Sequence, residues 1–314
     1  MKLTIIIPAH NRIGLLYEAI NSVAKLNLDS SEVIVCDDGS TDDVGGLCRT
    51  FESKGLEIIH SRTEENLGAQ VARNRGMELA RGELLLFLDS DDALTSEGLP
   101  DLLEAFEHDP SLDYVYGKVI RATERLDARR RGLLVGEEFS DSPYDVGGYH
   151  WHTIGALYRK DYLKRVGPWN VDMTGSQDWE YQARVKLEGG KRRFVNTVVG
   201  YWRQQHTAER VSAIEFRPDY VKSVMIACDV VLKIARKKNF CDTALEKRLA
   251  KRLMVHAIEW GANGYWLERK KCLFQAKNSQ SSSPIFKFSL MLMAYTPAIF
   301  DKLLYWFITK DRVG

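Results

Sequence analysis

The chain has 314 residues, of which 45% are hydrophobic and 28% are charged, values that are ordinary for a globular protein. This length allows one large domain or a catalytic domain with an appendage. The formal net charge of +1 argues against a general nucleic-acid-binding protein, because no strong positive field would collect phosphates.

The five cysteines are widely spaced, odd in number and without a C-x-x-C pair. This pattern predicts reduced thiols in a cytoplasmic protein rather than a disulfide framework or a zinc site. An apolar strand begins by residue 3, so we expect no secretory signal. The sequence also has no run of about 20 uninterrupted apolar residues, so we expect no membrane-spanning helix.

The first 120 residues alternate between strand and helix patterns. Apolar runs predict strands over 3–7, 32–36, 56–59, 84–88 and 114–120. Helical spacing predicts helices over 13–26, 69–80 and 96–107, and polar residues up to Asp42 can cap a further helix. Such alternation predicts an α/β fold with a mostly parallel sheet flanked by helices on both faces.

The loops lack the signatures of several enzyme classes. Residues 8–12 read PAHNR where a dinucleotide-binding unit would have G-x-G-x-x-G. The chain also has neither a G-x-x-x-x-G-K-[ST] loop nor a G-x-S-x-G elbow. These absences argue against a nicotinamide dehydrogenase, a P-loop nucleotidase and a Ser-His-Asp hydrolase.

An acidic stretch, Asp89-Ser90-Asp91-Asp92, follows the apolar strand 84–88. Carboxylates at the end of a buried strand are costly unless a positive group meets them, and ligands bind at this edge of open α/β sheets. Hard oxygen ligands suit Mn²⁺ or Mg²⁺, which would bring a phosphate-bearing substrate. The alternative is a strand-to-helix connection that uses these residues as turn and N-cap.

Four segments in order resemble the motifs of the family 2 inverting glycosyltransferases. They read IIIPAHNR at 5–12, VIVCDDGSTD at 33–42, NLGAQVARNRG at 66–76 and LDSDD at 88–92. The resemblance implies the A-type glycosyltransferase fold, a nucleotide-binding sheet with the sugar-donor site along its C-terminal edge. It also implies a metal-dependent, inverting transfer from a nucleotide-diphosphate sugar to an acceptor hydroxyl.

The same resemblance implies roles for residues of these motifs. Donor binding would fall to seven residues: Pro8, Ala9, Asp37, Asp38, Arg73, Asp89 and Ser90. Among the carboxylates, Asp91 would be the ligand of Mn²⁺ or Mg²⁺.

The second half contains a strand pattern at 155–159, a helix pattern at 160–166 and then a V-G-P-W turn before QDWEY at 177–181. This resembles the family's second-half motif, whose acidic position falls on Asp178. A helix N-terminus favours an ionised carboxylate, which a general base for the acceptor hydroxyl requires. Glu180 is the second candidate and points to another helix face. The alternative for Asp178 is a plain N-cap.

A strand pattern at 194–201 leads into a polar loop that resembles the family's segment over the diphosphate. There His206 would be a second metal ligand, and Arg203 or Arg210 would neutralise phosphate. The alternative for His206 is an ordinary surface histidine.

Two segments between these motifs each allow two structural interpretations. Residues 121–132 are charge-rich and form either a solvated surface loop or a contact to an acceptor phosphate. Residues 147–152 read GGYHWH and form either an aromatic wall on the acceptor side or a packed turn with Trp151 in the core.

The tail changes character after residue 212. It predicts helices over 219–238 and 244–268, a Ser-rich linker at 278–284 and an aromatic, lysine-flanked segment at 286–308. That last segment suits a helix in a membrane interface, or one packed on the catalytic domain or on a second copy of the chain. We therefore expect a catalytic domain at 1–212 and a helical C-terminal extension at 213–314 for oligomerisation or membrane docking.

Taken together, these features predict a glycosyltransferase that acts in cell-surface polysaccharide or glycolipid assembly. Its partners would be a nucleotide-diphosphate sugar, a glycan or lipid-linked acceptor and the inner face of a membrane, with no nucleic acid. A homo-oligomer formed through the C-terminal helices is also consistent with the tail. The alternatives are a nucleotidyltransferase acting on sugar phosphates and a non-catalytic, membrane-associated relative.

Overall fold

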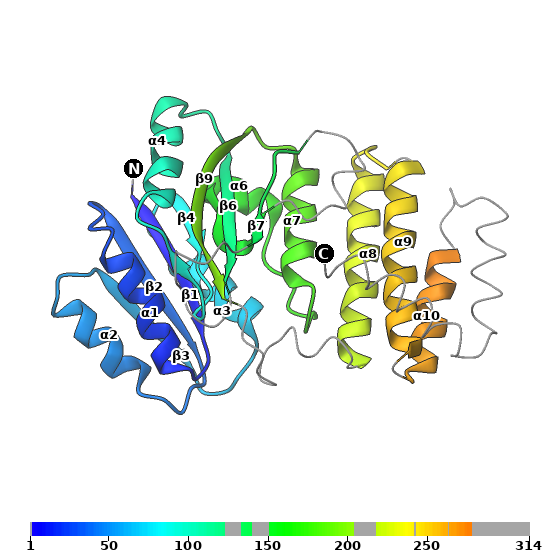
Figure 1. Ribbon diagram of the computed structural model, residues 1–314, viewed down its shortest axis with the longest axis horizontal. Helices are drawn as coiled ribbons and strands as arrows, with labels where there is room; N and C mark the ends of the chain where they lie inside the picture. The colour runs from blue at the N-terminus through cyan, green and yellow to red at the C-terminus, as the bar shows by residue number, and fades with distance from the viewer. Residues whose placement is uncertain are drawn as a thin grey trace. The chain divides into compact units, whose positions relative to one another are not determined.

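The computed structural model describes residues 2–122, 133–139, 151–203, 218–241, 243–262 and 264–277. Contacts divide the chain into two units, each described here by itself (Figure 1). The sheet unit takes residues 1–139, 149–171 and 188–206, and the helical unit takes residues 140–148, 172–187 and 207–314.

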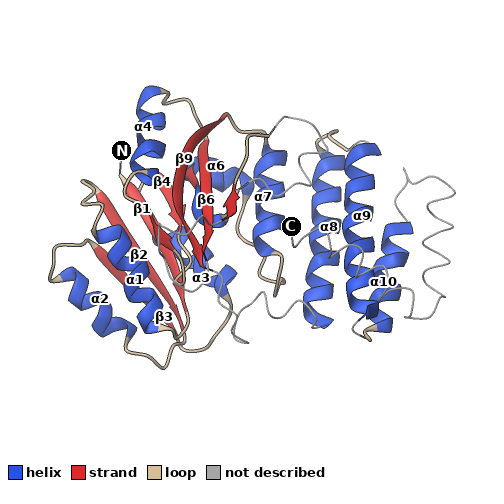
Figure 2. Ribbon diagram, in the orientation of Figure 1, coloured by secondary structure: helices blue, strands red, loops and turns tan. Residues whose placement is uncertain are grey.

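The described part of the sheet unit forms one nine-stranded sheet, in the order β3-β2-β1-β4-β8-β6-β9-β5 with β7 paired to β6. Figure 2 labels β1, β2, β3, β4, β6 and β9 of this sheet. The strands are β1 Leu3–Ala9, β2 Ser31–Asp38, β3 Ile58–Thr63, β4 Leu84–Phe87, β5 Ala93–Leu94, β6 Tyr114–Ala122, β7 Leu133–Val135, β8 Ala156–Arg159 and β9 Arg192–Arg203. The helices are α1 Ile13–Ala24, α2 Val44–Glu52, α3 Ala69–Leu79, α4 Gly98–His108 and α6 Lys160–Val166, with a 3₁₀ turn at Thr153–Gly155.

The parallel pairing that the sequence predicts is found in β3-β2-β1-β4. Beyond β4 the sheet is mixed, because β8 pairs antiparallel with both β4 and β6 while β9 runs parallel to β6. Parallel neighbours need a crossover, and α1, α2 and α3 supply it in the first half. The short strands β5 and β7 have no clear pattern of their own in the sequence.

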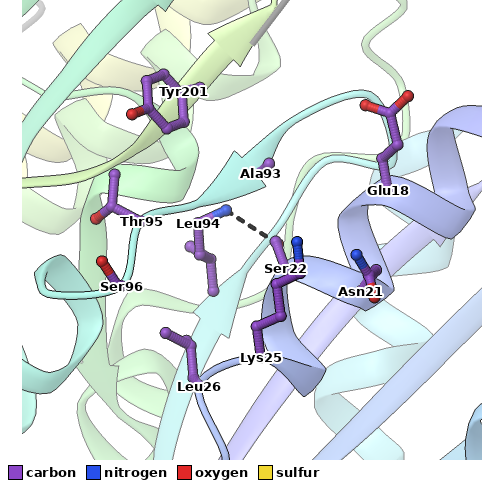
Figure 3. A pocket seen from close by; sticks show the side chains of 10 residues that line it. All are labelled: Glu18, Asn21, Ser22, Lys25, Leu26, Ala93, Leu94, Thr95, Ser96 and Tyr201. Carbon is purple, nitrogen blue, oxygen red and sulfur yellow. Dashed lines mark hydrogen bonds between the residues drawn. The ribbon is translucent and has the colours of Figure 1, made fainter. Parts of the chain in front are cut away.

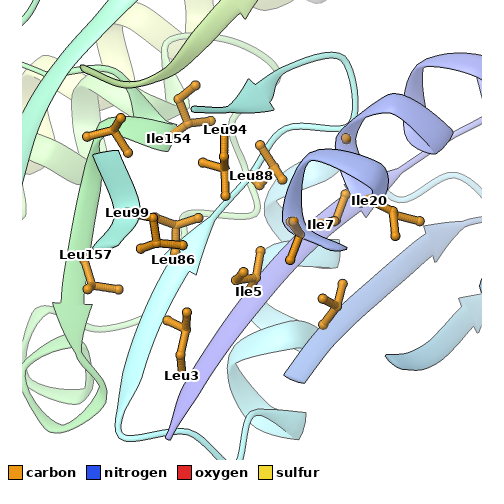
Figure 4. Packing of buried hydrophobic residues seen from close by; sticks show 14 of the residues in the cluster. Leu3, Ile5, Ile7, Ile20, Leu86, Leu88, Leu94, Leu99, Ile154 and Leu157 are labelled. Carbon is orange, nitrogen blue, oxygen red and sulfur yellow. The ribbon is translucent and has the colours of Figure 1, made fainter. Parts of the chain in front are cut away.

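Alternation along β1 divides its side chains between two faces of the sheet. Leu3, Ile5 and Ile7 belong to a buried core with residues of α1, α2 and α4 (Figure 4). Ile6 belongs to the other face, where α3 packs at Gly76. A Cβ built on Gly76 would overlap the Ile6 side chain, so a residue without a side chain is what lets this helix lie so close to the sheet.

Aromatic side chains fill the space around β6 and β8. Trp151 is fully buried, its ring lies 5.7 Å from that of Tyr114, and its indole N–H donates to the Tyr158 hydroxyl over 2.9 Å. Burial raises the pKa of the Tyr116 hydroxyl to about 12, so these tyrosines act as neutral packing groups. Trp151 is therefore a core residue, as one of the two interpretations of residues 147–152 predicts for it.

The helical unit contains α7 Gln177–Glu188 up to Leu187, then α8 Pro218–Lys237, α9 Thr243–Ala262 and α10 Trp266–Lys277. One side of α7 shares a second buried core with the three later helices. The single helix expected over 244–268 is two helices, separated near Gly264, whose φ of 86° lies in the left-handed region.

Several expectations fall outside the described residues. These are the charge-rich loop from 123 to 132, residues 147–150, His206, Arg210 and the segment 278–314. Among the helices that the structure describes, none is both long enough and apolar enough to cross a bilayer.

Candidate active site

The C-terminal ends of β1, β2 and β4 meet at one edge of the sheet. Ala9 lies opposite Asp37 in the register of β1 and β2, and Ile6 lies opposite Phe87 in that of β1 and β4. The loop 88–92 therefore leaves the sheet beside the strand ends that carry Pro8, Ala9, Asp37 and Asp38. This is the edge at which parallel α/β sheets bind ligands.

The loops after β1 and β2 are joined by reciprocal hydrogen bonds. The Asn11 N–H donates to Ser40 Oγ over 2.9 Å, and the Thr41 N–H donates to Asn11 Oδ1 over 2.8 Å. Asn11 and Arg12 both have left-handed backbone angles, with φ of 54° and 61°. Two such residues in a row are unfavourable, so these contacts hold a conformation that brings Arg12 Nη1 to 3.5 Å from Asp91 Oδ2.

Asp37 and Asp38 are buried and act as acceptors for neighbouring loops. Asp38 accepts the N–H groups of Leu67 and Gly68 over 2.8 and 2.7 Å. Asp37 accepts the Ser40 N–H over 3.0 Å. Both carboxylates thus shape the loops at the predicted donor edge, which the motif alone does not reveal.

Arg73 and Asp89, two of the predicted donor residues, form an ion pair. Arg73 is 7% exposed, and its Nη2 lies 2.6 Å from Asp89 Oδ1. Its guanidinium also lies 4.5 Å from the centre of the Trp169 ring. The adjacent Asn74 makes two hydrogen bonds to the Trp169 backbone, of 2.7 Å from the N–H and 2.9 Å to the carbonyl. Helix α3 therefore connects the acidic loop to the V-G-P-W turn.

One group among the described residues could hold a metal ion, and it consists of Asp89, Asp92 and His152. Each residue contributes one ligand atom, and these atoms lie within 4.8 Å of one another. Asp92 is 1% exposed and accepts the backbone N–H of Arg203 over 2.9 Å. The His152 ring stacks on Trp202 at 4.7 Å and places Nδ1 3.8 Å from Asp92 Oδ2. Two carboxylates and an imidazole fit Mn²⁺, and the carboxylates also fit Mg²⁺.

The sequence predicts Asp91 and His206 as metal ligands and does not single out Asp92 or His152. Of the two predicted ligands, His206 lies outside the described residues. Asp92 lies in the acidic stretch, so its residue type was a usable signal. The sequence contains no signal that marks His152 as a metal ligand, because this residue is far from Asp92 in the sequence and lies in a segment interpreted as an aromatic turn. Ser90 lies in the same loop, half-buried, between Asp89 and Asp91.

Asp178 belongs to the helical unit, in the first turn of α7. Its Oδ1 accepts the N–H of Trp179 over 2.8 Å. Glu180 is buried and paired with Arg184 through contacts of 2.6 and 2.9 Å, one to each of its oxygens. Glu180 is therefore paired with a cation of its own helix.

A pocket of about 270 Å³ lies elsewhere in the sheet unit, between α1, the β5–α4 connection and β9 (Figure 3). It is lined by Glu18, Asn21, Ser22, Lys25, Leu26, Ala93, Leu94, Thr95, Ser96 and Tyr201. None of these is a predicted donor or metal residue. Glu18 nevertheless pairs with Arg203, the predicted phosphate-neutralising residue at the end of β9.

Comparisons with known proteins identify the family of this chain. Residues 4–167 match the model of Glycosyl transferase family 2. A PGL/p-HBAD biosynthesis glycosyltransferase of Mycobacterium bovis is 32% identical over 185 residues, which cover 58% of this chain and 68% of that protein. A protein of the same name from Mycobacterium tuberculosis matches equally well.

Two solved structures have a similar fold at low sequence identity. S. aureus TarS in complex with UDP-GlcNAc has a TM-score of 0.71 and 20% identity, covering 96% of this chain and 89% of that one. The mannosyltransferase PcManGT from Pyrobaculum calidifontis, in complex with GDP-Man and Mn²⁺, has a TM-score of 0.58 and 15% identity, covering 99% and 86%.

These matches confirm the resemblance read from the four motifs, and the mixed sheet with flanking helices and a helical C-terminal region is the A-type glycosyltransferase fold. The chain belongs to glycosyl transferase family 2 and is a glycosyltransferase.

Proposed function

We propose that this glycosyltransferase moves a sugar from a nucleotide-diphosphate donor to a hydroxyl of a glycan or lipid-linked acceptor, with inversion at the anomeric carbon. The observation that carries the proposal is the acidic loop Asp89–Asp92 beside the ends of β1 and β2. A lipid-linked acceptor is supported by the mycobacterial relatives, which are named for PGL/p-HBAD biosynthesis. A nucleotide sugar is supported by the ligands of TarS and PcManGT.

The divalent cation would be held in the loop Asp89–Asp92. Asp91 is the ligand that the family resemblance implies, and the grouping of Asp89 with Asp92 and His152 supports a contribution from these three residues. A bound Mn²⁺ or Mg²⁺ would offset the charge of the departing diphosphate. On the same edge, the backbone of Pro8 and Ala9 and the loops shaped by Asp37 and Asp38 would receive the nucleoside. Arg73, which pairs with Asp89, would orient that carboxylate toward the nucleoside.

In this mechanism Asp178 takes the proton from the acceptor hydroxyl. The acceptor oxygen then forms a bond to the anomeric carbon while the bond from that carbon to the diphosphate oxygen breaks on the opposite face. One displacement inverts the configuration, so no covalent enzyme intermediate is needed. The pairing of Glu180 with Arg184 argues against Glu180, the second candidate, as the base.

A thermal-shift screen of UDP- and GDP-sugars, with and without Mn²⁺, tests donor binding, since a bound donor raises stability by mass action. Release of nucleotide diphosphate then tests turnover. We expect Asp91→Asn to lose the Mn²⁺-dependent shift. We expect Asp178→Asn to keep that shift while turnover falls at least about a hundredfold, the usual scale of acid–base catalysis. Near-normal turnover by Asp178→Asn would refute the base assignment.

A further inference from the structure

The turn that precedes Asp178 is held by two helices of the tail. Thr174 donates its backbone N–H to Ser223 Oγ of α8 over 2.8 Å, and the two hydroxyls lie 3.1 Å apart. One turn of α8 earlier, the Tyr220 hydroxyl accepts a hydrogen bond from Ser176 Oγ over 3.0 Å. Two residues of α8 therefore hold the turn at two separate points.

Helix α9 contributes a third contact through Arg252. Its Nη2 donates to Ser176 Oγ over 3.3 Å, and its guanidinium lies 4.1 Å from the centre of the Trp179 ring. Ser176 and Trp179 flank Asp178 in the sequence. Arg252 of α9 thus contacts residues before and after Asp178 in the sequence, and Trp179 itself is buried in the core of the helical unit.

The backbone of this turn needs such support. Ser176 has a φ of 52°, in the left-handed region that is unfavourable for a residue with a Cβ. Such conformations persist where the surroundings fix them, and they are common at functional sites. Beside it, a Cβ built on Gly175 would overlap the Tyr220 ring, so the turn and α8 are in direct contact with no space between them.

We propose that Tyr220, Ser223 and Arg252 are positioning residues that fix the carboxylate of Asp178. The proposal rests on the proposed function, in which Asp178 is the base. Proton transfer requires the base within hydrogen-bond reach of the acceptor hydroxyl, and a displacement of about 1 Å can cost on the order of a hundredfold in rate. The helices α8 and α9 are then part of the catalytic apparatus, whatever else the tail does.

The test uses the full chain with two variants and two matched controls. Tyr220→Phe removes one hydroxyl, and Tyr265→Phe removes a hydroxyl from a half-buried tyrosine immediately before α10. Arg252→Gln removes one cation, and Lys251→Gln removes the exposed cation next to it in α9. Three quantities are measured: hydrogen exchange of peptides over 173–179, affinity for UDP or GDP with Mn²⁺, and turnover of the fastest nucleotide sugar in a UDP- and GDP-sugar panel.

For Tyr220→Phe and Arg252→Gln we expect exchange over 173–179 to rise about fivefold to tenfold, the scale of one lost hydrogen bond. We expect turnover to fall about tenfold or more while nucleotide affinity stays within about twofold, because the contacts act on the base and not on the donor. The control variants should match the wild type in all three measurements.

Exchange over 173–179 that equals the wild type in both variants would overturn the inference, and so would turnover equal to that of the controls. Asp178→Asn separates this failure from that of the proposed function. If Asp178→Asn is inactive and the positioning variants are unaffected, the inference fails alone. If Asp178→Asn remains active, the assignment of the base fails first and the inference with it.

Discussion

The backbone N–H of Arg203 donates to Oδ1 of Asp92 over 2.9 Å, although the two residues are 111 positions apart. This hydrogen bond joins the end of β9 to the end of the acidic loop. It leaves Oδ2 on the side of His152, which stacks on Trp202. One buried carboxylate thus connects the loop of the proposed cation site with the last described strand of the sheet unit.

Asp92→Asn should therefore weaken Mn²⁺ binding. The amide oxygen can still accept the Arg203 N–H, so the fold should survive, but one negative charge and one ligand are lost. We expect affinity for Mn²⁺ to fall at least about tenfold, the lower end of the effect of altering a metal site. Calorimetric titration with MnCl₂ measures it. Asp161→Asn, at a largely exposed position, is the control. Wild-type affinity in Asp92→Asn together with loss in Asp91→Asn would assign the cation to Asp91 without Asp92.

Glu32 makes the stability of the sheet unit depend on pH. Its side chain is buried, and burial by itself would raise its pKa. Hydrogen bonds from the Thr4 hydroxyl at 2.6 Å and from Arg81 outweigh that cost, so the pKa of Glu32 is lowered below its ordinary 4.5. A lowered carboxylate pKa contributes stability that is fully present above the unfolded-state pKa and is lost as the pH falls through the folded-state pKa.

Thr4→Val should remove about 1–3 kcal/mol of unfolding free energy at pH 7, because the buried carboxylate loses its hydroxyl donor. Urea denaturation at pH 7 and pH 3 measures the effect. We expect the difference from wild type to shrink at pH 3, because that pH lies below the ordinary pKa of 4.5 and the stability contributed by the lowered pKa of Glu32 is lost as the pH falls. Thr4→Ser keeps the hydroxyl and should stay close to wild type at both pH values. A difference that does not change with pH would refute this role of Glu32.

Gly76→Ala should destabilise the protein by about 1–3 kcal/mol, the usual cost of overpacking a core. The new methyl group would overlap the Ile6 side chain and lie 3.2 Å from Cys36 Sγ, which forces α3 away from β1. Gly14→Ala is a matched control, since that helical position has nothing within 4 Å and should gain about 0.5–1 kcal/mol. Thermal or urea unfolding checks both. Equal effects of the two substitutions would contradict the close approach of α3.

Four of the five thiols should be unreactive in the native protein. Burial raises the pKa of Cys36 and Cys228 to about 12 and that of Cys48 to about 11, and Cys272 is also raised by burial. Cys241 is only half-buried, so it should react with Ellman's reagent at pH 8, more slowly than a free thiol because its pKa is also raised. Cys241→Ser should abolish the native reaction, and guanidinium should expose all five thiols of the wild type. Rapid reaction of a second thiol would contradict this burial.

The sequence by itself determined the first half of the fold and the location of the acidic loop. Continuous apolar runs identify β1, β2 and β4, and the strand-helix alternation makes them parallel neighbours. Polar residues that follow such strands must lie at one edge, so the grouping of Asp37, Asp38 and Asp89 needed no coordinates. Four motifs in the expected order predicted the family, and the match of residues 4–167 to the model of Glycosyl transferase family 2 confirms it.

The tertiary structure decided which side chains meet across long sequence separations. The grouping of His152 with Asp92, the two hydrogen bonds from Asn74 to Trp169, and the contacts of Tyr220 and Arg252 with the turn before Asp178 all join separate segments. Periodicity reports which face of an element is apolar, and it carries no information on which distant polar group that element will touch. The mixed half of the sheet was also decided by the tertiary structure. The direction of β8 depends on its pairing with β4 and β6 and not on its own four residues.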